Sequence, residues 1–127
     1  MAADGLDGDT LELLDRSVEV QIRTPRRDGS ISSRPIWVVV VDGEAYVRSW
    51  LGERGAWYRR ARADGRATIG TRGHTIDVGL EPADDDALNE RVSDAFRAKY
   101  GSRSPESTAE MVAPEVTRTT LRLTRAS

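Results

Sequence analysis

Arginine and aromatic side chains are concentrated in one stretch of this chain, residues 48–62, with the sequence RSWLGERGAWYRRAR. Residues 56–63 are good helix formers without a breaker. Arg54, Trp57 and Arg60 recur at three-residue spacing, so they share one side of such a segment. We therefore expect these three side chains to act together in binding. The alternative interpretation is an ordinary solvated helix face.

The chain offers few side chains for acid–base or nucleophilic catalysis. His74 is the only histidine and cysteine is absent, which excludes disulfides and the familiar zinc sites. His74 begins a predicted strand next to a turn, so we predict a surface side chain; we assign no catalytic residue and no metal ligand. What remains is a pocket of aromatic, backbone and arginine groups. Such a pocket suits a protein that binds a cofactor and leaves the difficult chemistry to it.

The positive charge lies in the middle of the sequence. Residues 1–22 carry six acids and one arginine, residues 23–72 carry eleven arginines and five acids, and residues 73–127 carry seven bases and ten acids. The net charge is nevertheless −2. Because the broad basic excess of nucleic-acid-binding proteins is missing, the composition argues against a nucleic-acid partner.

An apolar hairpin precedes the arginine-rich stretch. The run from Arg34 to Val41 is rich in β-branched residues, which predicts a strand buried on both faces. Asp42-Gly43 favours a tight turn, because glycine tolerates positive φ and aspartate bonds its own backbone. The partner strand is expected at Ala45–Arg48.

Four further segments have strand patterns, at residues 17–24, 66–71, 74–80 and 116–125, and the middle two are expected to pair around a turn at Arg72-Gly73. In the first, Val18, Val20 and Ile22 are expected on one face. We expect helices over Leu11–Leu14 capped by Asp9-Thr10, over residues 56–63, from the acids at 84–86 to Gly101, and from Pro105 to before Pro114. Six mostly antiparallel strands with short flanking helices predict a mainly β (α+β) fold, a small closed barrel.

Length and hydropathy predict one cytoplasmic domain spanning residues 1–127. The chain is long enough for a single hydrophobic core and has little room for a second. The start, MAADGLDGDT, lacks the features of a signal peptide, and no apolar run reaches the length of a membrane span. We expect residues 1–8 to be frayed and residues 17–125 to form the barrel and most of its helices.

Three stretches resemble one known superfamily. They are GSISSRPIWVVVVDGEAYVRSW, WYRRARADGRATI and the closing TLRLTR. They are similar to the flavin- and deazaflavin-binding split β-barrel superfamily, which is pyridoxamine phosphate oxidase-like. The closest similarity is to its deazaflavin-dependent nitroreductase branch and to related uncharacterised bacterial proteins. The branch usually has paired glycines and an Asn-Leu pair, where this chain has Leu51-Gly52 and Arg60-Ala61.

The resemblance implies a six-stranded antiparallel split β-barrel that binds FMN or a deazaflavin coenzyme. The strand along the flavin ring would comprise Arg34, Pro35, Ile36 and Trp37, and the phosphate-bearing tail would be held by Ser49, Gly52, Arg54, Trp57 and Arg60. This assignment is physically sensible, because guanidinium groups pair with phosphate in two-point geometry and a helix N-terminus adds free N–H groups. Each residue also has a structural interpretation, such as a core position for Trp37 or a turn position for Gly52.

Two classes of function follow. The first is a flavin- or deazaflavin-dependent oxidoreductase that transfers hydride to a small planar acceptor, a quinone or a nitroaromatic. The second is a non-catalytic binding module for a phosphorylated ligand or single-stranded nucleic acid. We favour the first class. The resemblance also implies a homodimer, because flavin split barrels commonly pair with the cofactor at the subunit interface.

Overall fold

The computed structural model describes residues 5–126. In chain order, its elements are α1 (Gly8–Arg16), β1 (Val20–Pro25), β2 (Ile31–Ile36), β3 (Val39–Val41), β4 (Glu44–Val47), η1 (Gly52–Arg54), α2 (Ala56–Asp64), β5 (Arg66–Thr71), β6 (His74–Pro82), α3 (Asp86–Tyr100), α4 (Pro105–Met111), α5 (Pro114–Thr117) and β7 (Leu121–Arg125). None of the helices in this described part of the chain is both long and apolar enough to cross a membrane.

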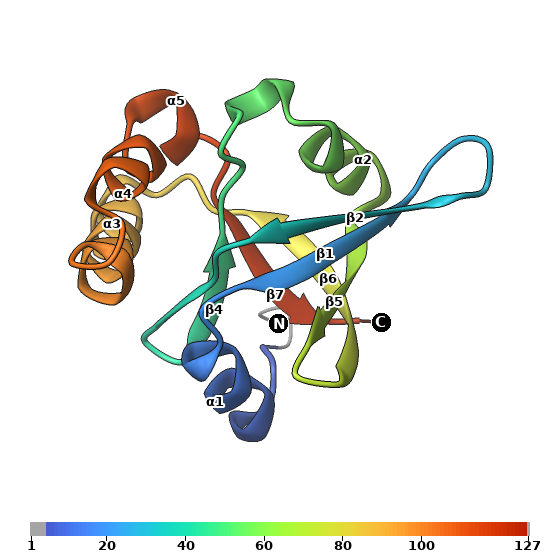
Figure 1. Cartoon of the computed structure of the whole chain (residues 1–127), viewed down its shortest axis with the longest axis horizontal. Helices are drawn as coiled ribbons and strands as arrows, with labels where there is room; N and C mark the ends of the chain where they lie inside the picture. Colours follow the sequence, from blue (N-terminus) through green and yellow to red (C-terminus); the bar gives the residue numbers. More distant parts are fainter. Residues whose placement is uncertain (1–4, 127) are drawn as a thin grey trace.

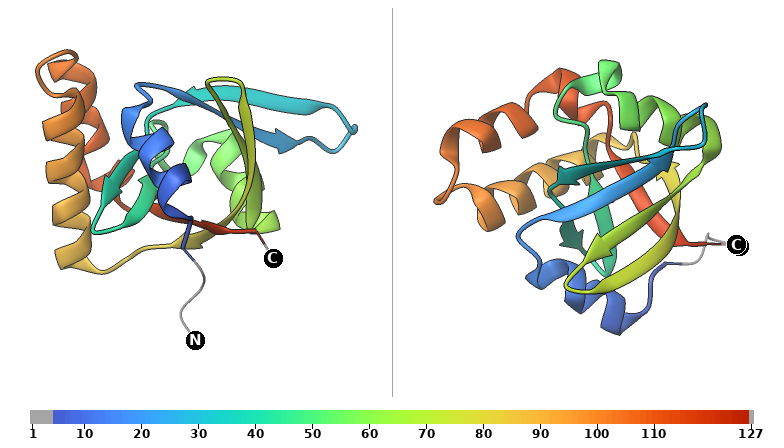
Figure 2. Two further views of the ribbon diagram at one scale, coloured as in Figure 1. Left: turned by 90° about the horizontal axis from the view of Figure 1, so that it is seen from below. Right: turned by 45° about the vertical axis from the view of Figure 1, so that its right-hand side comes forward.

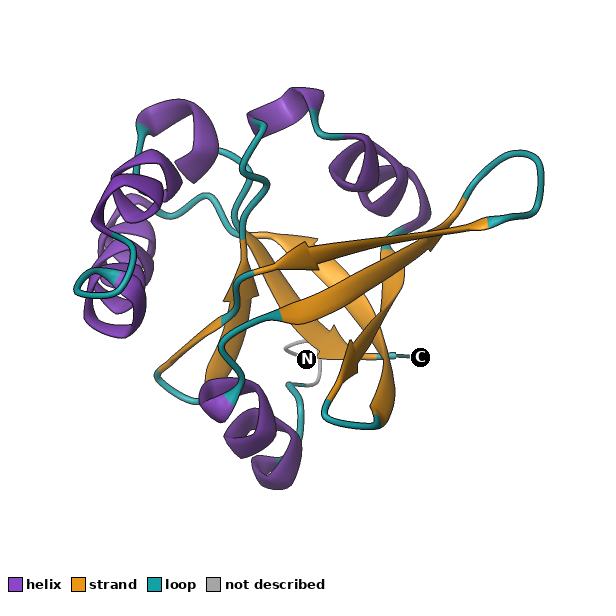
Figure 3. Ribbon diagram, viewed as in Figure 1, coloured by secondary structure: helices purple, strands orange, loops and turns teal. Residues whose placement is uncertain are grey.

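The strands form one antiparallel sheet that curls into a barrel (Figure 1 and Figure 3). Its order is β2-β1-β5-β6-β7-β4-β3, so the two edge strands are neighbours in sequence. Trp37 and Val38 connect them, and the barrel is joined at this point by the chain itself instead of a hydrogen-bonded ladder. The predicted mainly β (α+β) split barrel is confirmed, with seven strands instead of six.

The additional strand arises because the predicted run from Arg34 to Val41 is broken at Trp37-Val38. The Val38 N–H donates to the Tyr100 hydroxyl, and the Val38 carbonyl accepts from Lys99. Side chains of α3 thus occupy the backbone groups that a continuous strand would use in its ladder. The prediction of burial on both faces is correct only in part: Ile36, Val38, Val39 and Val41 are buried and Val40 is half-buried, whereas Arg34 and Pro35 are exposed on the edge strand β2.

Both predicted two-residue turns are confirmed. Asp42 and Gly43 have φ values of 50° and 79°, and Arg72 and Gly73 have φ values of 49° and 80°. Two consecutive residues with positive φ form the turn whose twist matches that of the strands it joins. The hairpins β3–β4 and β5–β6 are therefore encoded locally.

Two apolar clusters lie on opposite sides of the sheet. The cluster inside the barrel includes Val20, Ile22, Ile69, Val78, Leu121 and Leu123, and it is completed by Leu14 of α1 and by Trp57, Tyr58 and Ala61 of α2. The cluster outside contains Val39, Val41 and Tyr46 of the β3–β4 hairpin, packed on Val92, Phe96, Tyr100, Met111 and Val116 of the C-terminal helices. Figure 2 shows these helices stacked on one side of the barrel.

The N-terminal predictions need correction. Residues 1–4 lie outside the described part, but the expectation of fraying is wrong for residues 5–8: Gly5 forms a β-bridge with Thr124, and Gly8 begins α1. The α1 cap is Asp7 and not Asp9-Thr10, because the Asp7 carboxylate accepts from the Thr10 N–H at 2.8 Å. The following strand begins at Val20, so the predicted core position of Val18 is also wrong; this side chain is 46% exposed.

The last predicted strand is too long. Residues 114–117 form the short helix α5, which begins at Pro114, and β7 starts only at Leu121. The hydroxyls of Thr119 and Thr120 donate back to the carbonyls of Val116 and Thr117, which extends the turn beyond the helix. Leu121 and Leu123 nevertheless share the buried face, as predicted.

Candidate functional site

A cavity of about 480 Å³ opens between β2, the segment leading into α2, and α4. This volume lies in the usual range for small-molecule sites. Of the nine residues predicted to bind a cofactor, six line the cavity: Arg34, Pro35, Ile36, Trp37, Ser49 and Trp57. All three tryptophans of the chain contribute to its walls. The walls are therefore largely aromatic and apolar, which suits a flat organic ring.

The first wall is the end of β2 and the residue that follows it. Trp37 is half-buried, with one ring face stacked on Tyr100 at 3.9 Å between centroids and 5° between planes. Burial raises the pKa of Tyr100 to about 12, so its hydroxyl stays protonated. This hydroxyl donates to the Val18 carbonyl at 2.7 Å. The indole is thus held by a residue of α3 and is a fixed part of the cavity wall.

The opposite wall is the start of α2. Its N-cap, Gly55, supplies no side-chain cap, so the first-turn N–H groups are not taken up by a capping side chain. The Ser49 hydroxyl donates to the Gly52 carbonyl at 2.7 Å, and the Gly55 N–H donates to the same carbonyl at 3.1 Å. A Cβ at position 55 would collide with the Ser49 hydroxyl. Glycine is therefore needed where the loop closes on the helix.

The inner wall contains a buried arginine. Arg48 is 1% exposed and is the largest of the fully buried side chains among the described residues. Its Nε donates to the Thr120 hydroxyl at 2.9 Å, while its terminal nitrogens donate to the Ser93 hydroxyl at 2.9 Å, the Met111 carbonyl at 3.0 Å and the Asn89 carbonyl at 3.1 Å. These acceptors belong to α3, α4 and the segment before β7. Arg48 therefore joins the C-terminal helices to the barrel.

No carboxylate in the described residues forms an ion pair with Arg48. Burial, and to a smaller extent the positive charge of Arg97, lowers its pKa to about 10. The group remains a cation at neutral pH. The inner wall thus carries a positive charge that is stabilised by neutral oxygens and by the Phe96 ring, whose centroid lies 5.2 Å from the guanidinium carbon.

Three of the predicted site residues lie outside this cavity. Gly52 and Arg54 line a separate surface hollow between η1 and the residues around the start of α5. The Nε of Arg60 donates to the Thr24 hydroxyl of β1 at 2.8 Å. The three residues with helical spacing therefore do not form one surface, because Trp57 is buried towards the barrel while Arg54 precedes α2.

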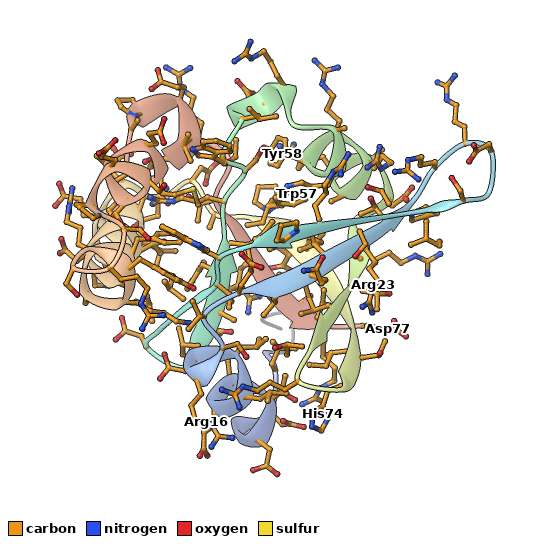
Figure 4. The ribbon with its side chains drawn as sticks, in the orientation of Figure 1. Arg16, Arg23, Trp57, Tyr58, His74 and Asp77 are labelled. Atoms are coloured by element: carbon orange, nitrogen blue, oxygen red, sulfur yellow. The ribbon has the colours of Figure 1, made fainter. Side chains whose placement is uncertain are left out.

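His74 is exposed at the start of β6, as predicted. Figure 4 places it at the β5–β6 turn, at the opposite end of the barrel from Trp57. It does not line the cavity. Among the described residues, no group of three or more histidine, cysteine or acidic side chains is arranged to hold a metal ion.

Sequence reasoning missed the cavity residues that come from distant elements. Arg48 was recognised only as the end of a strand, although it lies two residues after Tyr46 and so on the outer face, where the helices pack. Glu19, Ser107 and Met111 also line the cavity. Nothing in their local pattern indicates a site, since they reach it only through the packing of β1 and α4.

Comparison with known proteins identifies the family of the chain. A family model described as an uncharacterized protein conserved in bacteria (DUF2255) matches residues 10–123. The chain belongs to the DUF2255 family. No curated protein matches the sequence.

Solved structures share the fold of this DUF2255 chain at low identity. The conserved hypothetical protein Rv2991 from Mycobacterium tuberculosis matches with a TM-score of 0.66 and 15% identity, covering 100% of this chain and 84% of that one. The heme storage protein HutZ from Vibrio cholerae matches with a TM-score of 0.63 and 13% identity, covering 97% of this chain and 92% of HutZ. A FAD-binding protein from Mesorhizobium loti matches with a TM-score of 0.57 and 15% identity, covering 100% of this chain and 95% of that one. A putative pyridoxamine 5'-phosphate oxidase from Listeria innocua shares the fold too, with a TM-score of 0.56 and 13% identity, covering 91% of this chain and 87% of that one. The fold is that of the pyridoxamine phosphate oxidase-like split barrels, in agreement with the resemblance found in the sequence.

Proposed function

We propose that this DUF2255 chain binds a flavin-type cofactor, FMN or a deazaflavin, and acts as an oxidoreductase that transfers hydride to a small planar acceptor such as a quinone or a nitroaromatic. The observation that carries the proposal is the cavity between the end of β2 and the start of α2, in a fold shared with a FAD-binding protein. The cofactor, when bound, would supply the hydride chemistry.

The residues present fit a flavin ring. Pro35, Ile36 and Trp37 form an apolar wall that is held in place from behind by Tyr100. Trp57 is buried at the opposite wall. These side chains would orient a flat ring and exclude water from both of its faces, which is the main contribution that a protein makes to hydride transfer.

The phosphate-bearing tail would lie at the start of α2. The uncapped first-turn N–H groups and the hydroxyl of Ser49 are at that end of the cavity. Because Arg54 and Arg60 lie outside the cavity lining, they can contact only a part of the cofactor that leaves it. HutZ stores heme, but the single histidine of this chain lies away from the cavity, which favours a flavin over a heme.

Fluorescence titration of the purified chain with FMN and with a deazaflavin tests this proposal. We expect saturable binding of at least one of them, and tighter binding of FMN than of riboflavin, which lacks the phosphate. Turnover with a quinone acceptor should survive His74→Ala, because this residue lies outside the cavity. Absence of saturable binding at high micromolar concentration would favour the alternative, a non-catalytic module for a phosphorylated ligand.

Arg60 and Arg62 of α2 provide a matched pair of variants for testing contact with the phosphate-bearing tail of the cofactor. If Arg60 contacts the phosphate, Arg60→Ala should weaken FMN binding by about 1.5–3 kcal/mol, the range for hydrogen bonds to charged groups. Arg62 donates instead to the Tyr58 hydroxyl at 3.0 Å, so Arg62→Ala should have much less effect. Calorimetric titration of both variants measures the difference. Equal losses would indicate diffuse attraction by a cationic helix and no defined phosphate contact.

A further inference from the structure

The inner wall of the cavity carries a buried positive charge without a negative partner among residues 5–126. We infer that the cavity selects a planar aromatic anion over its neutral counterpart, and that the guanidinium of Arg48 is the group that selects it. This inference deepens the proposed function, because it states the charge of the ligand that the same cavity accepts. In this inference Arg48 acts on the ligand through its charge and forms no direct contact with it.

Arg48 has no donor left for a ligand. A guanidinium has five N–H donors, and all of them are directed at protein oxygens: one at Thr120, one at Ser93, one at the Met111 carbonyl and two at Asn89, the last at 3.5 Å. These bonds satisfy its hydrogen-bonding capacity, and the Phe96 ring lies 5.2 Å from the guanidinium carbon, but no carboxylate of the described residues neutralises the charge. In an interior of low dielectric, a fixed charge stabilises an anion several ångströms away without touching it.

The other charged residues on the cavity do not supply this effect. Glu19 and Arg34 both line it, but both are exposed and have opposite signs. Their fields oppose each other and are screened by water and salt. Glu110 does not line the cavity, and its carboxylate accepts from the indole N–H of Trp50 at 3.2 Å on the surface. The buried charge of Arg48 is therefore the dominant and least screened electrostatic feature of the cavity.

The ligand class follows from the combination of this charge with the walls. Trp37, Trp50 and Trp57 together with Pro35 and Met111 provide flat and apolar contacts. A ligand that satisfies both features is an aromatic ring with a delocalised or attached negative charge, such as an aromatic carboxylate, a phenolate or an ionised ring system.

A pair of small probes tests the inference directly. 4-Nitrobenzoate and 4-nitrobenzamide have nearly the same shape and differ in charge. Because all three tryptophans line the cavity, quenching of tryptophan fluorescence reports its occupancy. We expect the wild-type chain to bind the carboxylate roughly tenfold more tightly than the amide, the ratio for a charge pair about 10 Å apart at an effective dielectric constant of about 20. The preference should persist in about 0.5 M salt, since the charge is buried.

Three variants separate the charge from the architecture. Arg48→Lys keeps the charge and should keep most of the preference, whereas Arg48→Gln should bind both probes equally. Arg34→Gln, at an exposed cation of the same cavity, should keep the preference in high salt. A folded Arg48→Gln variant with the full preference would overturn the inference and leave Arg48 a purely structural connection. If the Arg48 variants do not fold, the wild-type chain decides alone: equal binding of the two probes, or a preference abolished by salt, overturns the inference.

The outcome is distinguishable from that of the proposed function. FMN titration of the same sample reports cofactor binding independently of the probes. Flavin binding without a probe preference would overturn only the anion selectivity. A salt-resistant preference without flavin binding would uphold the anion selectivity and overturn the flavin assignment.

Discussion

At the scale of single residues, a buried cation, Arg48, and a partly buried one, Lys99, connect α3 and the barrel in different ways. Arg48 has five oriented donors and uses them on oxygens from four residues. Lys99 donates only to the carbonyls of Leu14 and Val38, at 3.1 and 2.7 Å. A neutral amine can still donate twice, so Lys99 can lose its proton and keep both bonds. Arg48 cannot lose its proton at neutral pH.

This difference predicts a pH dependence of stability that belongs to Lys99. Burial lowers its pKa to about 8 from an ordinary value of 10.5. Between these values the unfolded chain binds more protons than the folded chain, so the free energy of unfolding rises with pH. The rise should total on the order of 2 kcal/mol after allowance for partial exposure of the amine.

Urea unfolding of the wild-type chain and of Lys99→Met at several pH values from 7.5 to about 9.5 measures this contribution. The free energy of unfolding of the wild type minus that of Lys99→Met should increase as pH rises across this window. Tyr100, whose pKa is raised to about 12, contributes only above its ordinary value of 10.0. Parallel curves for the two proteins would show that the Lys99 amine titrates normally in the folded chain.

The same residues show what sequence reasoning can and cannot find in a site. Pro35, Ile36 and Trp37 were predictable, because they are adjacent in sequence and match a family pattern. Arg48 and Met111 were not, because their place on the cavity depends on how α4 packs against the end of β4. The separation of Arg54, Trp57 and Arg60 was also unpredictable: the three-residue spacing is helical only if the helix includes all three, and α2 begins after Arg54.

At the scale of elements, the connection from β4 to α2 depends on one close approach. The Ser49 hydroxyl fills the space where a side chain at Gly55 would begin. Gly55→Ala should force this hydroxyl to turn and lose its bond to the Gly52 carbonyl, with a loss of stability of about 1–3 kcal/mol, the cost of an unsatisfied buried polar group.

A double-mutant cycle isolates this contact. Ser49→Ala should relieve the collision. The double variant with Gly55→Ala should therefore lose less unfolding free energy than the sum of the losses in the two single variants. Chemical denaturation of the four proteins gives the coupling energy. Gly8→Ala is the matched control: this glycine begins α1 with nothing near its missing Cβ, so alanine should be neutral or mildly stabilising. Strict additivity would show that Ser49 moves away at no cost.

The hairpins illustrate which elements were predictable from local sequence. Asp42-Gly43 and Arg72-Gly73 specify their turns by backbone preference alone, and both were found. The break at Trp37-Val38 was not, because it depends on Lys99 and Tyr100, more than sixty residues later in the chain. The helix at residues 114–117 was likewise hidden by an apolar pattern that also fits a strand.

At the scale of the whole molecule, the barrel leaves apolar surface at the mouth of its cavity. Trp50 and Leu51 line the cavity and are each 58% exposed. Exposed large apolar side chains beside a binding site are typical of surfaces that contact another protein. The resemblance to flavin split barrels implies that the partner at this surface is a second copy of the chain, which would close the cavity from outside.

We therefore predict a homodimer in which Trp50 and Leu51 are covered. Light scattering after gel filtration should give a mass of about twice the 14.0 kDa of one chain. Leu51→Asp places a charge in this contact, so it should shift the mass towards the monomer and weaken cofactor binding together, because the same surface closes the cavity. Ile31→Asp is the matched control, since Ile31 is 57% exposed at the turn end of the β1–β2 hairpin and does not line the cavity. A wild-type chain that remains monomeric at high micromolar concentration, with a cofactor affinity equal to that of Leu51→Asp, would show that one barrel forms the complete site.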